Sequence, residues 1–157
     1  ENKIKTALNP SLDQLSLKGI SRIINKVDVL ILNSREASFL TKIKPFQEKS
    51  VIHKIASLTK AIVIITKGKN GALAFDNKFL YNVPAQKTKV IDATGAGDSF
   101  GSGFVAGLIK ENNVEKALIL AMSNAIANIK IIGANQGLLK KRQSLLKIKI
   151  RKTKWSA

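Results

Sequence analysis

The stretch Val90–Ile109, VIDATGAGDSFGSGFVAGLI, decides how the whole chain is interpreted. Asp92 and Asp98 bracket a glycine-containing loop, and an apolar pattern with helical spacing follows at once. Gly95 and Gly97 allow the backbone to turn tightly and to approach a ligand without a side-chain clash. A helix that begins near Gly97 would point free N–H groups and its positive dipole end at that space, an arrangement that binds phosphate.

The position of Asp98 at this helix start has two interpretations. A carboxylate is favoured there simply as a negative charge near a helix N-terminus. It is also the group that phosphoryl transfer to an alcohol needs, because a base takes the hydroxyl proton while backbone amides stabilise charge on the transferring group. The residues alone leave both open. The loop is not a Walker A loop, since no Gly-Lys-Ser/Thr ending is present.

Composition narrows the class of protein. The 157 residues are 45% hydrophobic, which is enough for one globular domain with a core. No apolar run is long enough for a membrane span, so we expect no membrane partner. The chain has no cysteine, and its one histidine, His53, excludes a histidine-cluster metal site. The first residue is Glu1 and no signal-peptide pattern follows, so we expect a segment of a longer, cytoplasmic protein.

The net charge of +17 makes nucleic acid a candidate partner. Against it, the basic residues are spread along the chain, most are lysines, and few aromatics are available to stack on bases. Nucleic acid is therefore the less favoured partner. The basic ending, residues 140–155, is interpreted as a solvated helix followed by an edge strand.

The apolar periodicities predict alternating strands and helices. The expected strands are Ile4–Leu8, Val27–Leu32, Ala61–Thr66, residues 72–75 and 79–83 joined by a hairpin at Asp76-Asn77, and one that ends at Val90-Ile91. Helical spacing covers Leu12–Ile24, residues 34–43 with Ser34 as N-cap, Glu48–Leu58, the glycine loop to about Lys110, Val114 to about Ile131 with Gly133 as its stop, and a last short helix.

This alternation predicts an α/β fold, with a mainly parallel sheet covered by helices on both faces. In such sheets, ligands bind beyond the carboxyl ends of the strands. Three loops are expected there: residues 33–36, 66–71 and 92–98.

The first two of these loops are ambiguous by themselves. In TKGKNG, residues 66–71, two glycines could cradle phosphates or could form a plain hairpin turn. In NSRE, Asn33 and Glu36 could both reach one ligand, and the acid could hold a magnesium-bound water. The alternative for Asn33 and Glu36 is a helix-capping arrangement.

The order of four motifs carries a family resemblance. NSRE, TKGKNG, DATGAGD and the SNA of Ser123–Ala125 follow one another as in the ribokinase-like (PfkB-type) carbohydrate kinases, and DATGAGDSF is similar to the C-terminal signature of that family. The resemblance covers essentially the whole chain. It implies a single partial ribokinase-like domain, residues 1–157, that holds the ATP-binding and catalytic half, while the N-terminal substrate and lid half is absent.

The resemblance also implies roles for the catalytic loop. Asp98 corresponds to the general base that activates the substrate hydroxyl. Gly95, Ala96 and Gly97 correspond to the anion hole that holds the transferring phosphate.

Further roles concern the nucleotide and the metals. Asn33 and Glu36 correspond to the pair that binds magnesium, through water, and contacts the nucleotide phosphates. The residues that correspond to other nucleotide contacts are Thr66, Gly68 and Gly71 in the ATP-site loop, Gly97 at the phosphates and Asn124 on the adenine side. Asp92 and Thr94, with the backbone around Gly133, correspond to positions that bind a monovalent cation such as potassium.

The implied activity is ATP-dependent transfer of the γ-phosphate of Mg-ATP to a hydroxyl of a sugar or sugar-like substrate. A nucleoside or vitamin-precursor kinase of the same fold is the first alternative. The second is an inactive remnant or a basic nucleic-acid-binding module. In the family, the N-terminal half supplies most sugar contacts and a lid that often mediates dimers, so a homodimer is expected only of a full-length protein.

Overall fold

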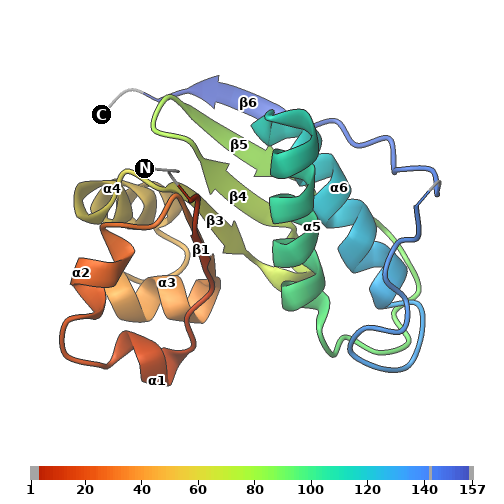
Figure 1. Ribbon diagram of the computed structural model, residues 1–157, viewed down its shortest axis with the longest axis horizontal. Coiled ribbons are helices and arrows are strands. Elements are labelled where there is room, and N and C mark those ends of the chain that lie inside the picture. Colours follow the sequence, from red (N-terminus) through yellow and green to blue (C-terminus); the bar gives the residue numbers. More distant parts are fainter. Residues whose placement is uncertain (1–3, 142, 156–157) are drawn as a thin grey trace. The chain divides into compact units, whose positions relative to one another are not determined.

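The structure, a computed structural model, describes residues 4–141 and 143–155 (Figure 1). These residues form two compact units. The first runs to Asn82 and resumes at Arg151, and the second is Val83–Ile150.

The described residues form six strands in one sheet, ordered β1-β2-β3-β4-β5-β6. The strands are β1 (Ala7–Leu8), β2 (Val29–Asn33), β3 (Ile62–Thr66), β4 (Ala72–Phe75), β5 (Phe79–Val83) and β6 (Arg151–Lys154). The helices are α1 (Leu12–Leu15), α2 (Ile20–Ile24), α3 (Ser34–Thr41), α4 (Glu48–Leu58), the 3₁₀ turn η1 (Gly68–Asn70), α5 (Ala96–Glu111) and α6 (Val114–Asn128).

The sheet is mixed, which refines the expectation of a mainly parallel one. β1 and β2 are parallel, as are β2 and β3, whereas β3 pairs antiparallel with β4 and β5 pairs antiparallel with β6. Long connections that contain helices permit the parallel pairs, but the short η1 connection permits only a reversal of direction. The predicted α/β fold is confirmed, with the parallel pairs confined to β1–β3.

The core of the first unit lies between one face of the sheet and helices α3 and α4. Leu30 and Leu32 of β2, with Val63 and Ile65 of β3, share this face because side chains alternate along a strand. They pack with Ala37 of α3 and with Val51, Ile52 and Ile55 of α4. Ile31 and Ile64, on the opposite face, are buried as well, which explains why both strands are continuous apolar runs.

The second unit is built on α5 and α6, which lie side by side (Figure 1). Small residues set their spacing. A Cβ atom at Gly107 would lie 2.7 Å from the Cα of Ala117, and one at Gly103 would lie 3.0 Å from the Cα of Ala121. These two glycines therefore allow a close approach of the helices that a larger residue would prevent.

The predicted strand ending at Val90-Ile91 is wrong. Residues 84–95 form no strand or helix. The N–H groups of Ile91 and Asp92 instead donate to the carbonyl of Ile129, at 2.8 and 3.3 Å, just past the end of α6. The carbonyl of Ile129, which is left free at the helix C-terminus, thus accepts the hydrogen bonds that a neighbouring strand would have accepted.

Three predicted helix boundaries also change. Gly19, with φ +87°, separates α1 from α2 inside the expected single helical segment. Helix α6 ends at Asn128 rather than Ile131. The last short helix is wrong, because residues 134–141 and 143–150 contain none.

The part of the chain after α6 is extended because side chains of α6 hold it. Leu139 N–H donates to Asn124 Oδ1 and Leu146 N–H donates to Ser123 Oγ, both at 2.9 Å. Strand β6 follows this segment and is the predicted edge strand. The Trp155 ring after it packs edge-on to the ring of Phe75. Within the described residues, no helix combines the length and apolarity that crossing a bilayer requires.

Candidate active site

The loops that follow β2 and β3 meet at one edge of the sheet. Asn33 and Thr66 are register partners at the carboxyl ends of these parallel strands. The Ser34 hydroxyl, one residue on, donates to the carbonyl of Thr66 at 3.3 Å. The structure therefore brings together loops 33–36 and 66–71, as the sequence predicted for a ligand site in an open α/β sheet.

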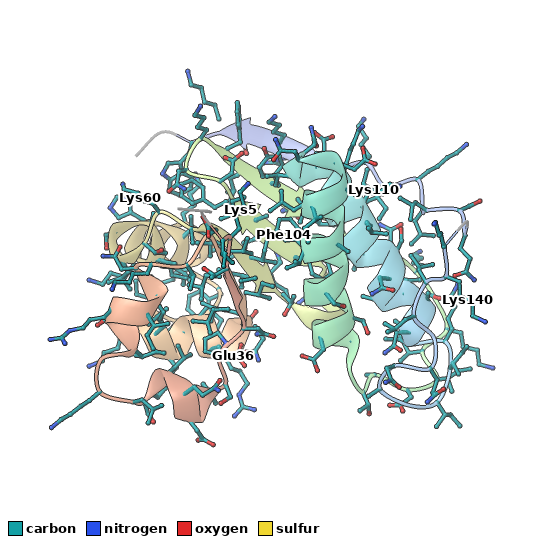
Figure 2. All side chains as sticks on the ribbon, viewed as in Figure 1. Lys5, Glu36, Lys60, Phe104, Lys110 and Lys140 are labelled. Carbon is teal, nitrogen blue, oxygen red and sulfur yellow. The ribbon has the colours of Figure 1, made fainter. Side chains whose placement is uncertain are left out.

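Asn33 and Glu36 form a reciprocal capping box at the start of α3. Asn33 Oδ1 accepts from the N–H groups of Arg35 and Glu36, both at 2.9 Å, and Glu36 Oε2 accepts from Asn33 N–H at 2.7 Å. The N-cap is therefore Asn33 and the prediction of Ser34 is wrong, because the longer amide closes two N–H groups while Ser34 already lies in the helix. Figure 2 labels Glu36 on this helix. In the described residues no donor reaches its Oε1, which stays available to a ligand.

The ATP-loop candidate, residues 66–71, is a closed turn. Gly68 and Gly71 have φ +53° and +84°, which other residues rarely adopt, and Lys67 N–H donates to the Gly71 carbonyl at 2.8 Å. The Lys67 ammonium lies 2.9 Å from Glu48 Oε1 on α4, with only 13% of its side chain exposed. Lys67 thus fixes the turn to α4.

The glycine loop of the second unit has the form of an anion-binding site. Gly95, with φ +73°, is the N-cap of α5, and its carbonyl accepts the first helical hydrogen bond from Ser99 N–H at 2.8 Å. No group in the described residues accepts from the N–H of Gly97 or Asp98. Both residues are exposed, and the Asp98 carboxylate lies in this same first turn. Free amides at a helix start are suited to a phosphate group.

Asp92 is held at the base of this loop. Its Oδ1 accepts from Thr94 N–H at 2.8 Å and its Oδ2 accepts from Gly133 N–H at 2.9 Å. Hydrogen bonds from the Thr94 side chain, the Gly133 backbone and the Thr94 backbone, in that order, lower the pKa of Asp92 to about 2. Asp92 is therefore an anion at neutral pH, and it ties the loop to the turn after α6.

Two buried asparagines of α6 complete the surroundings of the loop. Asn124 donates from Nδ2 to the Ser99 carbonyl at 2.8 Å and accepts from Leu139, so both of its polar atoms are occupied within the protein. Asn128 donates from Nδ2 to the carbonyls of Thr94 and Ala134, at 3.1 and 3.0 Å. The contact of Asn124 with an adenine stays a prediction.

Comparison with known proteins assigns the chain to a family. A sequence model of the pfkB family of carbohydrate kinases matches residues 1–141. The chain belongs to this family. The pfkB family match includes all of the predicted site residues and confirms the resemblance that the four motifs carried.

Individual pfkB relatives differ in what they phosphorylate. The chain is 30% identical to the ribokinase of Lactococcus lactis over 149 residues, 95% of this chain and 47% of that protein. It is 29% identical to the nucleoside kinase of Methanocaldococcus jannaschii over 73% of this chain and 36% of that protein. The crystal structure of ribokinase from Thermotoga maritima superposes with a TM-score of 0.74 at 26% identity, covering 86% of this chain and 46% of that one. The chain thus spans half or less of the length of these relatives.

Asn128 and Ala134 also lie beside the glycine loop, although no motif in the sequence predicted them there. Asn128 is a polar residue in the otherwise apolar stretch AIANI of a helix, and such a residue at a buried position must find partners. That mismatch was the available signal. Ala134 offered none, because it takes part through its backbone carbonyl.

Proposed function

We propose that this chain is the nucleotide-binding and catalytic part of an ATP-dependent phosphotransferase whose acceptor is a hydroxyl of a sugar or sugar-like molecule. One observation carries the proposal: the free N–H groups of Gly97 and Asp98 share the first turn of α5 with the exposed Asp98 carboxylate. An anion hole and a base in one turn are what phosphoryl transfer to an alcohol requires.

In this proposal, Asp98 takes the proton of the acceptor hydroxyl as that oxygen attacks the γ-phosphorus. The N–H groups of Gly95, Ala96 and Gly97 line the anion hole for the transferred group. Ala96 N–H also donates to the Ala93 carbonyl at 3.2 Å, so Gly97 is the better free donor of these two. The base contributes about 10²- to 10⁴-fold in rate, and the oriented amides stabilise charge that develops in the transition state.

Most of the residues proposed to bind the nucleotide lie in the first unit, and Gly97 and Asn124 of the second unit are proposed to contact its phosphates and its adenine. Asn33 and Glu36, at the start of α3, and Thr66, Gly68 and Gly71, in the adjacent turn, are the residues proposed to hold ATP and its magnesium. No group of three His, Cys, Asp or Glu side chains gathers within the described residues. A site with a single carboxylate, Glu36, fits Mg²⁺. This ion keeps several of its waters and is usually bound by one or two carboxylates together with phosphate oxygens, and Glu36 would bind it through a water. Magnesium would neutralise charge on the phosphates.

A monovalent cation is the least supported part of the proposal. The anionic Asp92, with Thr94 and the backbone near Gly133, supplies a negatively charged loop suited to potassium. Replacing potassium with tetramethylammonium should then lower turnover of the full-length enzyme. An unchanged rate would remove Asp92 and Thr94 from the cation role.

The acceptor class has two candidates. The ribokinase match over 95% of the chain favours a sugar, and the nucleoside kinase match over 73% of it favours a nucleoside. Because ATP is the proposed donor, we place the enzyme in the cytoplasm.

The test is phosphoryl transfer by the full-length gene product against a panel of sugars and nucleosides, with wild type and Asp98→Asn in parallel. Turnover on one acceptor, reduced about 10²- to 10⁴-fold by the substitution while ATP affinity is retained, is the expected result. Equal turnover in both proteins would exclude Asp98 as the base. Absence of turnover on every acceptor would overturn the proposed function.

A further inference from the structure

Asn128 lies at the last turn of α6 with its side chain fully buried. Its Nδ2 group donates to two backbone carbonyls from different segments: Thr94 in the glycine loop, at 3.1 Å, and Ala134 in the turn after α6, at 3.0 Å. The same side chain thus joins the loop that carries the free amides to the turn that packs beside it.

The orientation of this amide is fixed by its neighbours. Both Thr94 and Ala134 present carbonyl oxygens, which only accept, so the donor end of Asn128 must face them. Its Oδ1 is then left buried, and no donor in the described part of the chain reaches it. A buried acceptor without a partner is unfavourable, and an apolar side chain would avoid it. The contribution of Asn128 therefore lies in its two donated hydrogen bonds.

The bond to Thr94 acts directly on the anion site. The Thr94 carbonyl and the Gly95 N–H belong to one planar peptide group and point in opposite directions. Holding the carbonyl therefore fixes where the Gly95 N–H points. No acceptor for this N–H occurs in the described residues, so it is a free donor like those of Gly97 and Asp98.

The loop needs such a restraint because glycine does not supply one. Gly95 has φ +73° and can adopt many other conformations. Its Cα lies so close to the Ala134 carbonyl that an added Cβ would overlap with that oxygen. Asp92 fastens the other end of the loop to Gly133 N–H. Between these points, Asn128 is the side chain that holds the Thr94–Gly95 peptide.

We propose that Asn128 is a positioning residue for the anion hole: by binding the Thr94 and Ala134 carbonyls together, it orients the Gly95 amide toward the transferring phosphate. The effect on the loop stands on the hydrogen bonds alone. The effect on catalysis rests on the proposed phosphotransferase function.

The experiment compares Asn128→Asp and Asn128→Ala with Ser123→Ala in the full-length gene product. Aspartate keeps the shape of asparagine but replaces the donor with an acceptor facing two carbonyls. Ser123 is the matched control, because it is also buried and polar and lies on α6. Among the described residues, its hydroxyl accepts only from the distant Leu146 N–H. Amide hydrogen exchange of residues 92–98, melting temperature, kcat and KM for ATP are measured for each protein.

Both Asn128 variants should increase amide exchange about tenfold or more at Thr94 and Ala96, whose N–H groups donate to Asp92 Oδ1 and to the Ala93 carbonyl within the loop. They should also lower kcat about 10- to 100-fold, with KM for ATP changed by less than about twofold. Ser123→Ala should lower the melting temperature without either effect. Loop exchange equal to wild type in the Asn128 variants would overturn the proposal, as would a kcat loss in Ser123→Ala that matches theirs at equal melting temperature.

A wild-type enzyme that transfers no phosphate would defeat the proposed function, and amide exchange would then decide the role of Asn128 by itself.

Discussion

Gly95 and Gly97 stand two residues apart in one motif but differ in what their backbones require. Gly95 has a positive φ and faces the Ala134 carbonyl at a distance that excludes a Cβ. A Cβ at Gly97 would meet nothing within 4 Å. Gly95 is thus required by the backbone conformation of the motif, whereas Gly97 would be required only by the close approach of a ligand.

At this residue scale, Gly95→Ala should lower the free energy of unfolding by at least about 2 kcal/mol, from the left-handed conformation and the overlap together. Gly97→Ala should leave it unchanged to within about 1 kcal/mol, since the residue lies in a helical first turn. Urea unfolding of both variants measures this. Equal losses would mean that Gly95 is not held in the conformation described.

At the scale of elements, α3 depends on its capping box. Asn33→Ala removes the acceptor for two N–H groups and should lower the free energy of unfolding by about 0.5–2 kcal/mol. Ser34→Ala removes only the 3.3 Å hydrogen bond to Thr66 and should cost less. Chemical denaturation of the two variants tests the order, and a larger loss for Ser34→Ala would contradict the assignment of Asn33 as N-cap.

The hydrogen bond from Gly133 N–H to Asp92, which connects the turn after α6 to the glycine loop, should weaken when Asp92 is protonated at low pH. The pKa of Asp92 is lowered from 3.8 to about 2, so the ionised carboxylate is favoured by the folded protein. The stability that the ionised carboxylate contributes is present above its ordinary pKa of 3.8 and is lost as the pH falls through about 2. An NMR titration of the Asp92 carboxyl group should show a midpoint near 2, accompanied by a shift of the Gly133 N–H signal. A midpoint near 3.8 would mean that the two N–H bonds do not form.

For the whole molecule, the net charge of +17 should weaken the folded state at low ionic strength through repulsion. Raising sodium chloride from about 10 to 150 mM shortens the Debye length from about 30 to 8 Å and should raise the melting temperature. The variant with Lys140→Glu and Lys141→Glu should show a smaller salt response. Figure 2 labels Lys140 in the extended segment after α6. A melting temperature that falls with added salt would show that repulsion between like charges does not limit the stability of the fold.

The same two lysines separate the kinase from the nucleic-acid alternative. Lys140→Ala with Lys141→Ala should leave phosphoryl transfer unchanged, because neither residue belongs to the proposed catalytic loop or nucleotide loops. Filter binding to RNA and DNA should be weak and similar with and without the change. A steep, salt-dependent loss of binding would favour the nucleic-acid function instead.

The sequence was sufficient where a local pattern determines local structure. The apolar runs predicted β2 and β3, Glu48–Leu58 matches α4, and the motif order led to the family. It was insufficient where partners are distant in the chain. Nothing in the residues around Ile91 reveals that the carbonyl of Ile129 takes the place of a strand neighbour. The link from Asn128 to Thr94 spans 34 residues and depends on how the second unit packs.

Strand β6 pairs with β5, although the second unit lies between these two strands in the sequence. Asn82 and Arg151 are direct partners on β5 and β6, so the whole second unit is inserted between two residues that face each other. During synthesis, the outer edge of β5 stays unpaired until residues 83–154 have been made. Until then that edge is open to other chains. Replacing residues 83–150 with a short hairpin turn would join β5 to β6 directly and close the edge early, which makes the first unit a candidate for separate expression.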